Sequence, residues 1–113
     1  MSHAQIDAAT FAELQDTAGA EFAAELVGTF LEEAPGMLAE LREALAGAQD
    51  ERFRRTAHSL KSNCNTFGAL ALAAMARALE LGGLNAAKDA AALDALEAAY
   101  ARAAAELKEL SHG

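Results

Sequence analysis

Apolar residues recur every three or four positions along almost the whole chain, and this periodicity limits the possible folds more than any other feature. Such spacing places apolar side chains on one face of a helix. Alanine, the best helix former, fills roughly three positions in ten, whereas proline occurs once and tryptophan is absent. The β-branched and aromatic residues that strands favour are scarce. We therefore expect an all-α fold.

Breaks in the periodicity at glycine, proline and aspartate mark the expected helix boundaries. Pro35 is expected to begin a new helix, because proline is tolerated in the first turn of a helix and not in its interior. Asp50 is a suitable N-cap for the next helix. Short connections predict an up-down-up-down four-helix bundle with a short additional N-terminal helix lying across it. The expected segments lie near residues 10–17, 20–34, 35–47, 50–67, 72–82 and 93–110.

Two segments have apolar stripes that bear on a functional site. In the second segment the stripe is Phe22, Leu26 and Phe30. Val27 and Leu31 lie roughly 100° and 140° from this stripe. Each is expected either to be exposed near a site or to pack within the bundle. In the fourth segment the stripe consists of Phe53, Ala57, Leu60, Cys64 and Phe67.

Size and charge restrict the possible functions. A chain of 113 residues predicts one domain over residues 1–113. Its 9 basic and 17 acidic residues give a net charge of -8, which argues against nucleic acid and anionic membranes as partners. No apolar stretch is long enough to span a bilayer. One cysteine, Cys64, and the lack of a secretory signal predict a cytoplasmic protein, and a bundle that closes its own core predicts a monomer.

His58 is the histidine of interest, because His3 and His112 lie in polar termini where a solvated role is usual. At about 100° per residue, His58 lies roughly 140° from the apolar stripe of its helix, so we expect it to be exposed. Three cations surround it, Arg54, Arg55 and Lys61, and such charges would neutralise a phosphoryl group on the ring. A solvated basic face is the alternative interpretation. This stretch of the chain holds four of the nine basic residues: Arg52, Arg54, Arg55 and Lys61.

The run AHSLKSNCNTFGA over residues 57–69 resembles the histidine-containing phosphotransfer (HPt) domain family, whose pattern is A-H-x-L-K-G-S with G-A some ten residues after the histidine. The stretch FLEEAP at 30–35 and the pair Leu79-Glu80 also resemble the family. The resemblance implies that His58 is phosphorylated at Nε2, that Lys61 steadies the phosphoryl group, and that Glu80 orients the ring; ordinary surface charge is the alternative for Glu80. The expected binding residues are Arg54, Arg55, Ser62 and Asn65.

The sequence departs from the family pattern after Lys61, where Ser62 replaces the usual glycine and Asn63 and Cys64 follow. The Ser62 hydroxyl would either crowd a docking partner or donate a hydrogen bond to a phosphoryl oxygen. Cys64 falls on the apolar stripe and is expected to pack as a small hydrophobic residue. No Cys and His spacing typical of a metal site is present, so we expect no metal.

The resemblance implies a phosphocarrier rather than an enzyme. We expect it to accept a phosphoryl group from a response-regulator receiver domain and pass it to another, with a histidine kinase or hybrid kinase upstream. Mg²⁺ is expected on the receiver, and no cofactor is expected on this chain. No nucleotide-binding motif supports autokinase activity. The alternatives are an unphosphorylated helical adaptor for an acidic partner and a substrate domain phosphorylated in trans by a chemotaxis-type kinase.

Overall fold

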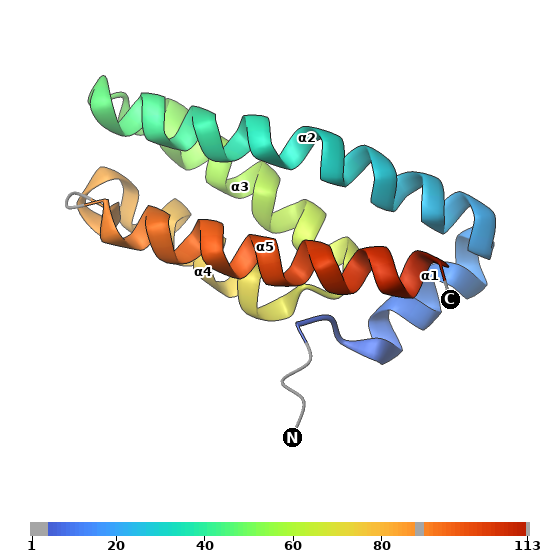
Figure 1. The fold of residues 1–113 in the computed structure, drawn as a ribbon. Coiled ribbons are helices and arrows are strands. Elements are labelled where there is room, and N and C mark those ends of the chain that lie inside the picture. The colour runs from blue at the N-terminus through green and yellow to red at the C-terminus, as the bar shows by residue number, and fades with distance from the viewer. Residues whose placement is uncertain (1–4, 88–89, 113) are drawn as a thin grey trace.

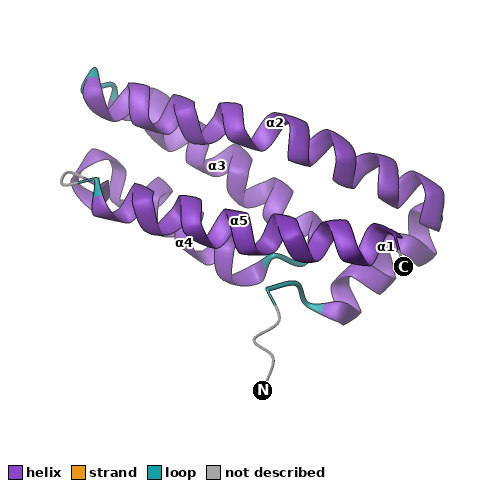
Figure 2. Ribbon diagram, viewed as in Figure 1, coloured by secondary structure: helices purple, strands orange, loops and turns teal. Residues whose placement is uncertain are grey.

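The computed structural model describes residues 5–87 and 90–112, and every regular element in them is helical (Figure 2). The all-α prediction is therefore confirmed. His3 lies outside the described residues, and His112 ends the last helix. The elements are α1 (Ala8–Ala18), α2 (Ala20–Ala46), α3 (Asp50–Phe67), α4 (Leu70–Gly82), the short 3-10 helix η1 (Gly83–Ala87) and α5 (Ala91–His112).

Four helices surround the core. Helix α2 packs against α3 and α5, and α4 packs against the same two helices, so α3 and α5 lie across the core from each other (Figure 1). Helix α1 packs against one end of α2 and α3. An aromatic cluster joins three of the helices, with the Phe30 ring 5.2 Å from Phe67 and 6.0 Å from Tyr100. None of the described helices is long and apolar enough to cross a bilayer.

The boundary predicted at Pro35 is wrong, because α2 continues through it as one helix of 27 residues. Proline has no N–H to donate to the carbonyl of Leu31, four residues earlier. The Tyr100 hydroxyl of α5 approaches that carbonyl at 3.5 Å and donates to it in place of the missing backbone group. Ala34 and Leu38, on either side of the proline, are buried and keep both halves of α2 on the same core.

The stripe predicted for the first half of α2 is confirmed at Phe30 but is displaced by one position before it. Phe22 is 52% exposed, whereas Ala23 and Val27 are buried. Val27 is thus ordinary core, and Leu31 is half-buried against the same cluster. The small Ala23 lies in the first turn of α2, a helix that packs against α1, and a phenylalanine there would need more room than close helix packing gives.

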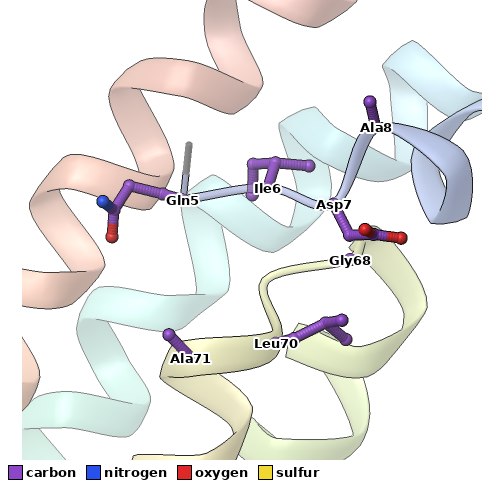
Figure 3. Close-up of a pocket in the computed structure, with 7 residues that line it drawn as sticks. All are labelled: Gln5, Ile6, Asp7, Ala8, Gly68, Leu70 and Ala71. Atoms are coloured by element: carbon purple, nitrogen blue, oxygen red, sulfur yellow. The ribbon is translucent and has the colours of Figure 1, made fainter. Parts of the chain in front are cut away.

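Gly68 ends α3 in the left-handed conformation, with φ of 82°. Its carbonyl accepts a hydrogen bond from the Asp7 N–H at 2.8 Å, so the segment before α1 crosses the α3–α4 turn. A side chain at Gly68 would approach the Asp7 backbone within 2.9 Å. Figure 3 shows this crossing and the hollow of about 320 Å³ beside it. The turn therefore requires glycine for its φ and for close approach.

The start of α3 lies one residue earlier than predicted. Gln49 occupies the N-cap position without a side-chain cap, and Asp50 is already helical. The Asp50 carboxylate instead accepts hydrogen bonds from the Leu84 N–H at 3.0 Å and from Arg54 at 2.8 Å. A carboxylate expected to cap its own helix thus connects α3 to the turn after α4.

Candidate functional site

His58 lies on the exposed face of α3, with 56% of its side chain accessible. Its neighbours Ala57 and Leu60 are fully buried, as are Phe53 and Cys64 on the same stripe. The core face of α3 therefore fixes the rotation of the helix and directs the imidazole outward, and the predicted exposure of His58 is confirmed.

Glu80 of α4 contacts the ring of His58. The distance from His58 Nδ1 to Glu80 Oε2 is 2.8 Å. An ionised carboxylate only accepts hydrogen bonds, so this contact places a proton on Nδ1, and in a neutral ring Nε2 then keeps its lone pair. Because α3 and α4 pack side by side, two residues 22 positions apart in sequence form one hydrogen-bonded pair.

Lys61 holds the other oxygen of the same carboxylate. Its Nζ lies 2.8 Å from Glu80 Oε1, and about three-quarters of each side chain is covered. The hydrogen bond from Lys61, followed by that from His58, lowers the pKa of Glu80 below its usual value. Glu80 is therefore ionised at neutral pH. Lys61 is expected to act on a phosphoryl group, and its ammonium has two further donors besides the one given to Glu80.

The two arginines before His58 differ in their contacts. Arg54 binds Asp50 and donates to the carbonyls of Glu80 and Leu81 at 3.2 and 3.0 Å. Arg55 is exposed and has no ion pair in the described part of the chain. Both line a hollow of about 320 Å³ beside the imidazole, together with Glu51, His58 and Glu80. Of the two arginines, Arg55 is thus the one whose charge is available to a partner.

A second hollow, of about 170 Å³, lies farther along α3. Asn65 lines it beside Lys61, in agreement with a position near the site. Its α4 wall includes Arg77, an exposed cation that the sequence analysis did not single out. The signal was the spacing of three between Arg77 and Glu80, which puts both on one helix face. The remaining lining residues are Leu70, Ala73 and Ala74.

Ser62 is exposed one turn beyond His58. Its backbone carbonyl accepts a hydrogen bond from Thr66 Oγ1 at 3.1 Å, and the neighbouring Asn63 bonds back to the Ser59 carbonyl at 3.0 Å. Of the two replacements, Asn63 thus forms a side-chain hydrogen bond along α3. The Ser62 side chain stays on the surface that a partner would approach.

Two other features, a buried cysteine and a hollow at the α3–α4 turn, do not add reactive groups to the site. Burial raises the pKa of the Cys64 thiol to about 12, so this cysteine stays protonated. The hollow beside Gly68 has one charged lining residue, Asp7, whose carboxylate caps α1 through Thr10. Among residues 5–87 and 90–112, no group of three or more His, Cys, Asp or Glu side chains forms a metal site.

These observations define a class of protein: a helical bundle that presents an exposed histidine, with a carboxylate on its inner nitrogen and cations around it. The family profile of the Hpt domain matches residues 25–108. The match covers most of the chain, so the chain belongs to the HPt domain family. Domains of this family are phosphocarriers of two-component signalling, not kinases, and they interact with receiver domains and kinases. No curated protein and no solved structure matches the chain.

Proposed function

We propose that the protein is a phosphorelay intermediate that accepts a phosphoryl group on His58 from the phosphoaspartate of one receiver domain and passes it to another. The observation that carries the proposal is the 2.8 Å contact between His58 Nδ1 and Glu80 under an exposed ring. A histidine that is only a surface residue does not need its inner nitrogen fixed, whereas a nucleophilic Nε2 does.

The transfer step is a displacement at phosphorus. The lone pair of His58 Nε2 attacks the phosphoryl group as the bond from phosphorus to the aspartate oxygen breaks, and that oxygen leaves with the electron pair as a carboxylate. The proton on Nδ1 stays in place, so the phosphorylated ring is cationic. Glu80 balances this charge through the bond it already makes. The reverse displacement delivers the phosphoryl group to the second receiver.

Charge around the ring supports docking of an acidic partner surface. Arg55 and Arg77 line hollows on either side of the His58–Glu80 pair. Receiver domains bring the phosphoaspartate and, as we expect, the Mg²⁺ that neutralises the transferring group. Lys61, which binds the same carboxylate as His58, supplies a cation from this chain. We propose that the protein docks as a monomer; its expected cytoplasmic location stays a prediction.

The experiment is transfer of labelled phosphoryl from a phosphorylated receiver, with Mg²⁺, to wild type and to His58→Gln. We expect acid-labile, alkali-stable label on wild type and none on the variant, while both bind the receiver. A histidine or hybrid kinase replaces the receiver in a parallel reaction, which tests phosphorylation in trans.

The adaptor alternative gives a different pattern. An adaptor would bind its partner equally well as wild type and as His58→Gln, would lose binding with Lys61→Glu, and would take no label. Absence of label from every receiver and kinase, on protein shown to be folded by circular dichroism, would contradict the phosphocarrier proposal.

A further inference from the structure

Arg54 was expected to be a docking cation, yet its guanidinium is engaged within the molecule. Its Nε lies 2.8 Å from Asp50 Oδ2, and its Nη1 donates to the backbone carbonyls of Glu80 and Leu81. These carbonyls belong to the last turn of α4, where no backbone N–H of the same helix is available. An arginine is favourable there, because it satisfies the carbonyls and opposes the negative end of the helix dipole.

The turn after α4 has the backbone conformation and the space that this contact requires. Gly83 is buried with φ of 63°, and any side chain there would clash with Asp50 and with the Arg54 guanidinium. The second oxygen of Asp50 accepts the Leu84 N–H at 3.0 Å. These hydrogen bonds lower the pKa of Asp50, that from Leu84 most, so the carboxylate is ionised at neutral pH. Asp50 and Arg54 together fasten the end of α4 to the start of α3.

The fastened residue is the one that orients the nucleophile. Glu80 is bound through its carbonyl by Arg54 and through its carboxylate by His58 and Lys61. The hydrogen bond from Arg54 to the Glu80 carbonyl holds the backbone of Glu80 in place. The distance from the Glu80 carboxylate to His58 Nδ1 depends on the position of that backbone. A misplacement of about 1 Å at such a site is enough to slow a reaction by about 100-fold.

We propose that Arg54, held by Asp50, is a positioning residue that acts through Glu80 to keep His58 in its Nδ1–H tautomer with Nε2 free to attack. The inference rests on the proposed function of His58. It assigns Arg54 a role before any partner docks, and it distinguishes Arg54 from the neighbouring Arg55, whose charge faces solvent.

A small phosphoryl donor separates positioning from docking. Phosphoramidate passes its phosphoryl group to His58 Nε2 as its own P–N bond breaks and ammonia leaves, and it needs no protein surface. The test compares Arg54→Ala with wild type in this reaction, together with the ¹⁵N shifts of the neutral His58 ring, which report the tautomer. We expect the phosphorylation rate to fall about 10-fold and the two ring tautomers to become mixed.

Arg52→Ala is the matched control. Arg52 is also on α3 and similarly exposed, but it binds Glu43 of α2 at 3.3 Å and forms no hydrogen bond or ion pair with α4 in the described residues. Its removal deletes the same charge and an interhelix ion pair, so we expect a rate within about 2-fold of wild type and an unchanged tautomer. Asp50→Asn, which keeps the shape of the side chain but weakens its hold on Arg54, is the second variant if Arg54→Ala does not fold; we expect it to shift both readouts in the same direction.

The outcomes separate the two proposals. If wild type is labelled by phosphoramidate and passes the label to a receiver, while Arg54→Ala and Asp50→Asn match Arg52→Ala in rate and tautomer, the positioning role is wrong and the phosphocarrier function stands. If labelled wild type passes its phosphoryl group to no receiver, the phosphocarrier function fails, and the tautomer comparison still decides the role of Arg54.

Discussion

At the scale of single residues, Glu80 connects the two helices that form the site. Its carboxylate lies between a histidine and a lysine that are one helical turn apart on α3. Each oxygen accepts from one of them, so neither donor displaces the other. The shared carboxylate thus connects Lys61 and the His58 ring through one side chain. In the proposed function, this carboxylate also keeps the proton on Nδ1 of the nucleophile.

Replacement of Glu80 by glutamine should slow transfer to and from a receiver by about 10-fold or more, because an amide presents a donor as well as an acceptor and no longer fixes the tautomer. Timed transfer assays with wild type, Glu80→Gln and Glu33→Gln measure this effect. Glu33 is an exposed glutamate of α2 and controls for the loss of one negative charge. Equal rates for the three proteins would contradict the role of Glu80.

The same carboxylate makes stability depend on pH. Hydrogen bonds from Lys61 and His58 lower the pKa of Glu80 from 4.5, so its contribution to folding is present above about pH 4.5 and is lost as the pH falls through the lower value of the folded state. We expect wild type to be more stable than Glu80→Gln at pH 7, and the difference to shrink below pH 4.5. Urea unfolding at pH 7, 5, 4 and 3 measures it; a constant difference would show that the ion pair contributes nothing.

At the scale of elements, α2 illustrates how a tertiary contact changes the outcome of a local rule. Pro35 leaves the Leu31 carbonyl without its backbone donor, and the Tyr100 hydroxyl donates from α5. Burial raises the pKa of Tyr100, so this hydroxyl is protonated at neutral pH. The helix therefore continues past a residue that usually ends one, with the buried Ala34 and Leu38 on the core on either side.

A double-mutant cycle tests this compensation. Tyr100→Phe should destabilise wild type by about 0.5–1.5 kcal/mol, the usual contribution of one hydrogen bond. In the Pro35→Ala background the same change should cost less, because the alanine that replaces the proline would give the Leu31 carbonyl a backbone N–H donor again. Chemical unfolding of the four proteins supplies the free energies. If Tyr100→Phe costs the same in both backgrounds, the hydroxyl does not replace the missing donor.

At the scale of the whole molecule, one face carries exposed positive charge although the net charge of the chain is negative. The chain carries -8 overall, yet Arg55 and Arg77, two exposed arginines with no ion pair among the described residues, lie on the α3–α4 face. Arg54 and Lys61 lie on the same face, where carboxylates bind them. A local positive field on an acidic protein attracts an acidic surface to one side only, and salt screens it over about 8–10 Å. In the proposed function, this charge directs an acidic partner to the face that holds His58.

Arg77→Glu tests the α4 side of this face. We expect transfer from a phosphorylated receiver to slow roughly 10-fold at low ionic strength and the difference from wild type to narrow as salt is added. Arg102→Glu makes the same charge change on α5, which lies across the core from α3. Equal slowing by the two variants would mean that net charge alone, and not a local contact, is responsible.

The sequence by itself determined the helical class, the stripe of α3 and the exposure of His58, because these depend on residues three and four apart in one helix. The A-H-x-L-K pattern also marked His58 and Lys61. Tertiary structure decided three further points: the continuity of α2 through Pro35, the burial of Ala23 in place of Phe22, and the use of Arg54 on the end of α4. Each depends on a group from another helix, and the distance between helices is not encoded in local periodicity.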